Sequence, residues 1–173
     1  DILNRKAEPW KVTLVDTGES SMTGGRLLKV KKYLDNKTFC STYGDGLSNL
    51  NIKKLIQSHK EKSLKATVTA VQPPGRFGSL KIEKNLITAF QEKPEGDGGW
   101  INGGFFVLNK KIFNYLEDDK TIFEEDVLTQ MSKINELKAF LHKGFWRPMD
   151  TLRDKNFLQE RWINQKADWK IWD

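Results

Sequence analysis

The segment Ile101-Asn102-Gly103-Gly104-Phe105-Phe106-Val107-Leu108 is nearly continuous in apolar and small residues. A strand that is covered on both faces has this composition, so we predict a strand in the middle of a sheet. Glycines inside a strand weaken it and often mark the close approach of a ligand. The Asn102 side chain offers both a donor and an acceptor, which suits a sugar hydroxyl. The segment therefore predicts a central strand with a polar ligand beside it.

Further strands and helices alternate on both sides of this segment. Apolar residues at helical spacing predict helices after Thr23 and around residues 52–59 and 112–115. Capping boxes at Thr121 with Glu124 and at Thr151 with Asp154 predict two more helix starts. The predicted strands cover residues 10–16, 38–43, 66–71, 101–108 and 137–141, with a hairpin at 79–82 and 86–92. This order favours an α/β fold, with a mixed, mostly parallel sheet flanked by helices and one antiparallel element.

The composition is ordinary for a globular protein. The 173 residues are 38% hydrophobic and 30% charged, so we expect a single domain over residues 1–173. No apolar run is long enough for a transmembrane helix, and the first residues lack the apolar core of a signal peptide. The single cysteine excludes an intrachain disulfide, and a reducing cytoplasm fits. The net charge of +6 suits an anionic small substrate; nucleic acid is a weaker alternative, because the lysines are spread thinly.

Two aspartates each lie where an apolar strand gives way to a turn. Asp45 lies between Gly44 and Gly46, and Asp150 precedes the capped helix at Thr151. Taken singly, Asp45 also fits a plain turn and Asp150 a helix-entry residue. A pair of carboxylates from distant parts of a chain suits Mg²⁺, which takes oxygen ligands and keeps positions open for substrate phosphates. The pair therefore indicates chemistry on phosphorylated substrates.

Other segments add possible ligand contacts. Lys93 follows a predicted strand and precedes a proline, so it offers a compact positive charge for a phosphate, with Glu92 placed to accept sugar hydroxyls. An exposed strand end is the alternative reading. Thr23-Gly24-Gly25 at a helix start offers backbone N–H groups to a phosphate, or an ordinary threonine N-cap. His59 lies on the apolar stripe of a helix, so we expect it to be packed rather than catalytic.

Taken together, the motifs resemble the sugar-phosphate nucleotidylyltransferases, most closely the glucose-1-phosphate cytidylyltransferases. The resemblance runs from Glu8 to Trp172, and its most specific parts are Phe-Trp-x-Pro-Met-Asp-Thr-Leu-Arg-Asp-Lys and Pro-Pro-Gly-Arg-Phe-Gly. The segments that carry it, in order, are Val15-Asp16-Thr17-Gly18, Met22-Thr23-Gly24-Gly25-Arg26, Thr42-Tyr43-Gly44-Asp45-Gly46, Pro73-Pro74-Gly75-Arg76-Phe77-Gly78, Phe90-Gln91-Glu92-Lys93-Pro94, Gly96-Asp97-Gly98, Ile101–Leu108, Gly144-Phe145-Trp146 and Pro148–Lys155.

This resemblance implies a nucleotide-diphospho-sugar transferase fold of Rossmann-like type. It also implies an enzyme that joins CTP and α-D-glucose 1-phosphate into CDP-glucose and pyrophosphate, for deoxysugar and O-antigen-type lipopolysaccharide biosynthesis. By the same resemblance, Asp45 and Asp150 hold the catalytic Mg²⁺ and Lys93 contacts the sugar phosphate. The other implied substrate contacts are Glu92, Asn102 and Gly78 in the hexose pocket, Gly18, Thr23 and Gly24 on the nucleotide side, and Thr42 and Gly46 beside Asp45.

The chain departs from the family pattern at its start. The family begins with a strand and a Gly-x-Gly-Thr-Arg loop that cradles the triphosphate, and this sequence starts shortly before Trp10. We therefore expect an N-terminally truncated domain without its first βα elements, and little catalysis from this chain alone. The resemblance further implies a homo-oligomer that binds neither nucleic acid nor membrane. The alternatives are another nucleotide or sugar phosphate, or a non-catalytic sugar-nucleotide-binding or assembly module.

Overall fold

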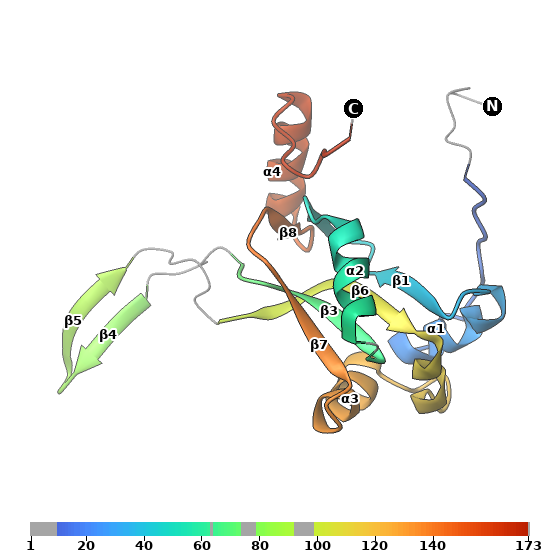
Figure 1. Ribbon diagram of the computed structural model, residues 1–173. Helices are drawn as coiled ribbons and strands as arrows, with labels where there is room; N and C mark the ends of the chain where they lie inside the picture. Colours follow the sequence, from blue (N-terminus) through green and yellow to red (C-terminus); the bar gives the residue numbers. More distant parts are fainter. Residues whose placement is uncertain (1–9, 63, 74–78, 92–98, 173) are drawn as a thin grey trace.

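A four-stranded mixed sheet forms the centre of the molecule (Figure 1). The computed structural model describes residues 10–62, 64–73, 79–91 and 99–172. The strand order is β1 (Thr38–Thr42), β6 (Ile101–Asn109), β3 (Ala66–Val71) and β7 (Leu137–His142). β6 runs antiparallel to both of its neighbours, and β3 and β7 are parallel. The predicted mixed α/β sheet is confirmed, and so is the inner position of the strand that begins at Ile101. The expectation that its pairs are mostly parallel is not met in the described residues, where β3–β7 is the one parallel pair of this sheet.

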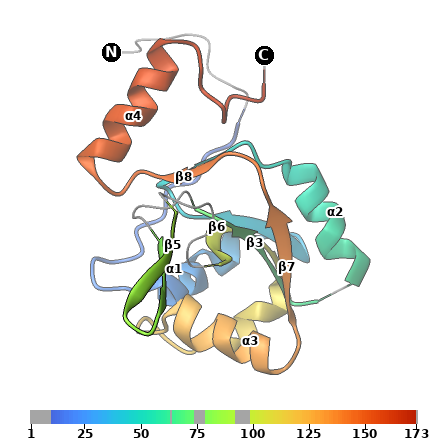
Figure 2. The same ribbon diagram turned by 90° about the vertical axis from the view of Figure 1, so that its left-hand side faces the viewer.

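Alternation along β6 supplies two hydrophobic clusters, one on each face of the sheet. Phe106 and Leu108 pack into the larger cluster, whereas Val107 packs with Leu50 and Leu55 in the smaller one. Successive side chains of a strand point to opposite faces, so a continuous apolar run must be covered on both. Figure 2 shows α2 on one side of the sheet and α1 and α3 on the other. The bounds are α1 Thr23–Val30, α2 Ile52–Lys62 and α3 Thr129–Lys133, with 3-10 segments η1 Lys31–Tyr33 and η2 Lys110–Tyr115.

The two predicted capping boxes have different outcomes. Helix α4 (Leu152–Ile163) begins with a reciprocal bond pair between Thr151 and Asp154, as predicted. The box at Thr121 and Glu124 is wrong: the π-helix η3 (Phe123–Leu128) follows Ile122, whose N–H donates to the Asp126 carboxylate at 2.7 Å. Thr121 instead accepts from two earlier amides, and Glu124 reaches across to other segments. The sequence contains the capping-box pattern twice. The Glu124 carboxylate, however, hydrogen-bonds to residues that are distant in the sequence and does not cap a helix.

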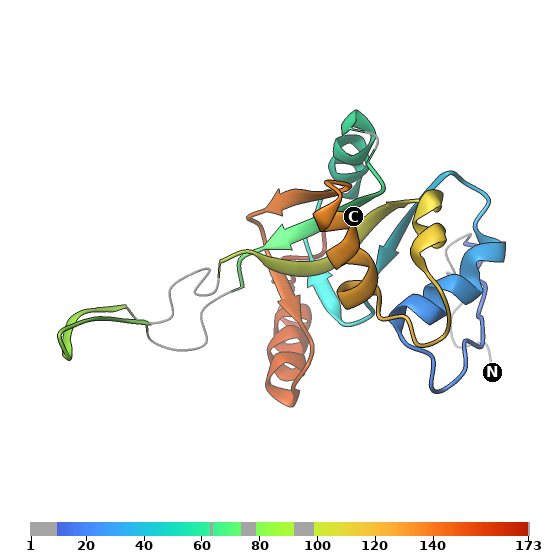
Figure 3. The ribbon, with the colours of Figure 1, turned by 90° about the horizontal axis from the view of Figure 1, so that it is seen from below.

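Two smaller sheets accompany the main one. β2 (Gly46–Ser48) pairs antiparallel with β8 (Trp146–Pro148). β4 (Ser79–Glu83) and β5 (Leu86–Gln91) form the predicted hairpin, which extends away from the central sheet in Figure 3. Its two-residue turn is Lys84-Asn85, with φ values of 47° and 66°. Positive φ at both central residues is the geometry that matches the twist of a hairpin, and asparagine tolerates it well.

The predicted strand at residues 10–16 is wrong. Residues 10–18 have no regular secondary structure, and Val12 and Leu14 are 71% and 92% exposed. A strand exists only where a neighbouring backbone pairs with its N–H and C=O groups, and alternation in the sequence does not supply that neighbour.

None of the helices in the described ranges is long and apolar enough to cross a bilayer.

His59 is packed as expected, at 3% exposure, with Nδ1 lying 2.9 Å from the Thr67 hydroxyl. Burial lowers the pKa of this imidazole below its ordinary value of 6.5, and the nearby Lys138 charge lowers it further. The folded protein therefore holds the ring neutral, while the unfolded chain takes up a proton near pH 6.5. The stability that this group contributes is fully present above that pH and is lost as the pH falls below it.

We predict that unfolding free energy, measured by urea denaturation, falls between pH 7 and pH 5 in the native sequence and falls less in the His59→Gln variant. Glutamine keeps a polar partner for Thr67 but does not titrate. The carboxylates of Asp154 and Glu136 have ordinary pKa values of 3.8 and 4.5, and the fold lowers both. Their contribution to stability is therefore lost mainly below pH 5, outside the range of this measurement. Parallel pH curves for the two proteins would contradict the prediction.

Candidate functional site

The pairing of β2 with β8 brings the segments of Asp45 and Asp150 together. Gly46 lies opposite Pro148, and the Met149 N–H donates to the Asp45 carbonyl at 2.8 Å. Asp150 is the next residue along. Both aspartates are exposed, so their carboxylates are accessible to a ligand. The structure therefore places on adjacent strand ends the two residues that the sequence proposed as a pair.

A buried carboxylate fixes the chain on the far side of Asp150. Asp154 is 7% exposed, and its side chain accepts from the Thr151 hydroxyl at 2.7 Å and from the Arg147 guanidinium at 3.0 Å. The Thr151 hydrogen bond, with smaller help from Arg147, lowers the pKa of Asp154 below its ordinary range. Arg147 lies on β8 and Thr151 caps α4. Asp150 is therefore held between two segments that one carboxylate ties together.

The donor set suits a hard divalent cation that is completed by substrate. Among the described residues, no three histidine, cysteine, aspartate or glutamate side chains gather as a metal cluster. Mg²⁺ does not require one, because it commonly binds through one or two carboxylates plus phosphate oxygens and waters. Two exposed aspartates on neighbouring strand ends meet that requirement. The residues present therefore fit the metal that the sequence predicted.

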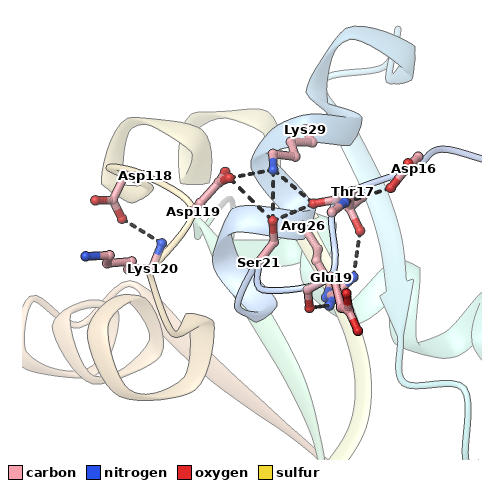
Figure 4. Close-up of polar contacts among 10 residues, drawn as sticks. Asp16, Thr17, Glu19, Ser21, Arg26, Lys29, Asp118, Asp119 and Lys120 are labelled. Atoms are coloured by element: carbon pink, nitrogen blue, oxygen red, sulfur yellow. Dashed lines mark hydrogen bonds and ion pairs between the residues drawn. The ribbon is translucent and has the colours of Figure 1, made fainter.

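A lysine organises the loop that precedes α1 (Figure 4). Lys29 Nζ donates to the Thr17 carbonyl at 2.9 Å and to Ser21 Oγ at 2.8 Å, and it pairs with Asp119 at 2.5 Å. Gly18, expected on the nucleotide side, has a φ of +79° and donates its N–H to Asp16 Oδ1 at 2.8 Å. A positive φ is accessible to glycine without steric cost. Hydrogen bonds thus hold this loop through both its backbone and its side chains.

The start of α1 is engaged by the protein itself. Met22 is the N-cap residue, with no side-chain cap bond, so Thr23 is not the cap. The Gly24 N–H donates to the Thr121 carbonyl at 2.9 Å, and a Cβ on Gly24 would lie 2.7 Å from that oxygen. The Gly24 amide is therefore occupied by the fold. Thr23 is exposed, and its hydroxyl donates to Glu124 Oε2 at 2.7 Å.

Asn102 lies at the start of β6 against Tyr43. Its Nδ2 donates to the Tyr43 hydroxyl at 3.1 Å, and its Oδ1 accepts from the Gly104 N–H at 2.9 Å. Gly104 has a φ of +77°, and a Cβ there would lie 2.5 Å from the Tyr43 ring. At Gly103, a Cβ would lie 2.8 Å from Val71. The close approach that the two glycines indicated is therefore made by protein side chains.

The remaining expected residues have different outcomes. Thr42 ends β1 with its hydroxyl donating to the Tyr43 carbonyl at 3.0 Å, and Gly46 begins β2. Gly78, Glu92 and Lys93 lie outside the described residues. The structure thus places Asp45, Asp150 and Gly46 around the β2–β8 ends, whereas Thr42 lies at the end of β1, next to the residue to which Asn102 is hydrogen-bonded.

Sequence reasoning gave no role to Tyr43 and Glu124, which the structure joins to the candidate residues Asn102 and Thr23. The Tyr43 hydroxyl donates a short hydrogen bond to Glu124 Oε1. Burial, followed by that bond and the Glu124 charge, raises the pKa of Tyr43 well above its ordinary value. Tyr43 stands next to the glycine–aspartate turn in the sequence, a position that could have drawn attention to it. Glu124 gave no such signal, because its position fitted a capping box.

Comparison with known proteins gives consistent results. A family model described as nucleotidyl transferase matches residues 10–156. The chain is 52% identical over 174 residues to the glucose-1-phosphate cytidylyltransferase of Salmonella typhi, covering 100% of this chain and 68% of that protein. It is 30% identical over 168 residues to mannose-1-phosphate guanyltransferase 2 of Candida glabrata, covering 91% of this chain and 46% of that protein. It therefore spans only part of each relative's length.

A solved structure supports the same relationship. The crystal structure of HddC from Yersinia pseudotuberculosis complexed with GMP-PN superposes with a TM-score of 0.62 at 30% identity, covering 83% of this chain and 64% of that one. The sheet and helices described above thus belong to an established fold.

The glycine at 104 offers a direct test of the Tyr43 packing. We predict that Gly104→Ala lowers the free energy of unfolding by about 2 kcal/mol or more, because alanine disfavours a positive φ and its Cβ would overlap the Tyr43 ring. Gly44→Ala is the matched control, since a Cβ there meets nothing within 4 Å. It should change stability by about 0.5 kcal/mol or less in urea unfolding. Equal losses in the two variants would show that the ring contact is unimportant.

Proposed function

Because this chain belongs to the nucleotidyl transferase family, we propose that the complete protein transfers the cytidylyl group of CTP to α-D-glucose 1-phosphate. The products are CDP-glucose and pyrophosphate. The observation that carries this proposal is the 52% identity, over the whole chain, to a protein named for that activity. The juxtaposition of the Asp45 and Asp150 segments by the β2–β8 pair supports it.

In the proposed reaction, a phosphate oxygen of glucose 1-phosphate attacks the α-phosphorus of CTP. The new P–O bond forms as the bond to the β-phosphate oxygen breaks, and pyrophosphate leaves with the electron pair. Asp45 and Asp150 would hold Mg²⁺, which when bound offsets the negative charge of the phosphates. Most of the rate enhancement then comes from orientation and electrostatic stabilisation, and no covalent enzyme intermediate is required.

Asn102 retains hydrogen-bonding capacity for a sugar. A side-chain amide has two N–H donors and two acceptor lone pairs. One N–H is used by Tyr43 and one lone pair by Gly104. The remaining donor and acceptor suit a hydroxyl, which can both accept and donate, and the side chain is exposed. We propose that this remainder contacts the hexose, with Lys93 on the sugar phosphate and Glu92 and Gly78 beside it.

We predict that the full natural polypeptide carrying this sequence releases pyrophosphate from CTP only when glucose 1-phosphate and Mg²⁺ are both present. Parallel assays with GTP, UTP and dTTP test the base, since a relative 30% identical is named for guanylyl transfer. Faster turnover with GTP and mannose 1-phosphate would replace the cytidylyl assignment. Tight binding of CDP-glucose in calorimetry without any turnover would favour the non-catalytic module. The homo-oligomeric state stays a prediction, which light scattering on the purified protein would test.

The metal pair has its own test in the same assay. We predict that Asp45→Asn and Asp150→Asn each reduce kcat at least a hundredfold, because a neutral amide binds Mg²⁺ far more weakly than a carboxylate. Asp35→Asn, an exposed loop residue outside the site, is the matched control and should retain normal turnover. Near-normal activity in either site variant would remove that residue from the metal site.

A further inference from the structure

One carboxylate, that of Glu124, joins segments that are far apart in the sequence. Its Oε2 accepts from the Thr23 hydroxyl at 2.7 Å, and its Oε1 accepts a short hydrogen bond from the Tyr43 hydroxyl. Thr23 begins α1, Tyr43 follows β1 and Glu124 lies in η3. The side chain is half-buried, and of its two bonds the one from Tyr43 is partly shielded from water, whereas the one from Thr23 is exposed.

The direction of each hydrogen bond is determined by its neighbours. The Thr23 hydroxyl oxygen already accepts from the Phe123 N–H at 2.9 Å, so its proton is free to go to the carboxylate. An ionised carboxylate only accepts, so the Tyr43 proton also points to Glu124. The Tyr43 oxygen is then left as an acceptor, and it receives Nδ2 of Asn102 at 3.1 Å.

The same logic fixes the orientation of the Asn102 amide. Its Oδ1 must face the Gly104 N–H, and its Nδ2 must face the Tyr43 oxygen. A tyrosine hydroxyl that instead pointed its proton at Asn102 would favour the opposite amide orientation. That orientation would set the Gly104 N–H against an NH₂ group, which cannot accept. The Gly104 N–H and the Tyr43 oxygen therefore hold the Asn102 amide together, and Glu124 contributes by directing the Tyr43 proton away from Nδ2.

Packing, by contrast, holds the Tyr43 ring without help from Glu124. The ring lies edge-to-face on Phe106 with centroids 5.6 Å apart, and the Tyr43 N–H donates to the Gly104 carbonyl at 3.0 Å. Replacing Glu124 with a side chain of similar size that lacks both acceptor oxygens should therefore leave the ring in place and change only the hydroxyl's hydrogen bonding. This separation makes the role of Glu124 testable apart from the stability of the fold.

We propose that Glu124 is a positioning residue for the sugar side of the site: it fixes the Tyr43 hydroxyl as an acceptor and so presents the free donor and acceptor of Asn102 to the hexose. This inference rests on the proposed function for the identity of the ligand. Glu124 itself touches neither substrate in this scheme, and it acts through Tyr43. A residue that merely began a helix would have no such link to Asn102.

The test is a double-mutant cycle on the full natural polypeptide with glucose 1-phosphate as the varied substrate. Glu124→Met and Tyr43→Phe should each raise KM for glucose 1-phosphate about tenfold, the effect of losing one well-placed hydrogen bond. Methionine is used because glutamine would keep an acceptor oxygen that could still face Tyr43. The double variant should also show about a tenfold increase, because both changes break the same chain of contacts. Glu125→Met, on the exposed neighbouring residue, is the matched control and should leave KM unchanged. Unchanged KM in Glu124→Met, or a double effect near a hundredfold, would overturn the proposal.

A second measurement needs no substrate. The side-chain NH₂ resonances of Asn102, assigned by their loss in Asn102→Asp, should shift in Glu124→Met and stay in place in Glu125→Met. If the native protein proves inactive with CTP and glucose 1-phosphate, the proposed function fails, and the Asn102 resonances still decide the positioning role. Unshifted resonances in Glu124→Met would reject that role whatever the substrate is.

Discussion

Strand β6 is paired on both sides, and this double pairing constrains the rest of the structure. Its alternating side chains fill one hydrophobic cluster with Phe106 and Leu108 and the other with Val107. Because both faces are covered, neither the register of β6 nor its orientation can shift without exposing large apolar groups. The first residues of the same strand lie at the edge of the site. The strand whose side chains fill the core thus also carries Asn102.

The glycines of β6 show how the core and the site are coupled. At Gly104 the backbone adopts a positive φ, and the Tyr43 ring occupies the space that a side chain would take. Trp146 approaches the neighbouring Gly103, donating its indole N–H to that carbonyl at 2.8 Å. Tyr43 leads into the Asp45 turn and Trp146 begins β8, the strand before Asp150. The segments that lead to Asp45 and Asp150 therefore each contact one of two adjacent glycines of the central strand.

Local signals in the sequence predicted those elements whose causes are local. The Thr151–Asp154 box and the hairpin of β4 and β5 depend on residues a few positions apart, and both form as expected. The apolar run at Ile101 was sufficient to predict an inner strand. Alternation at Val12 and Leu14 was insufficient, because a strand also requires a neighbour. The capping box predicted at Thr121 and Glu124 does not form for a similar reason, because residues distant in the sequence hydrogen-bond to the Glu124 carboxylate.

The candidate site shows the same difference between features with local causes and features with long-range causes. The chemistry of Asp45 and Asp150 could be proposed from their residue type and turn context, but their adjacency depends on the β2–β8 pair, which no local pattern encoded. Glu124 is the more instructive case, because a plausible local role concealed it. Its two acceptor oxygens satisfy hydroxyls from two distant segments, and a hydroxyl that can point either way takes its direction from whichever neighbour can only accept. A half-buried carboxylate at such a junction sets donor and acceptor roles for groups it does not touch. Its influence on a ligand can therefore extend beyond its own contacts, which is why contact-by-contact reading of a sequence overlooks it.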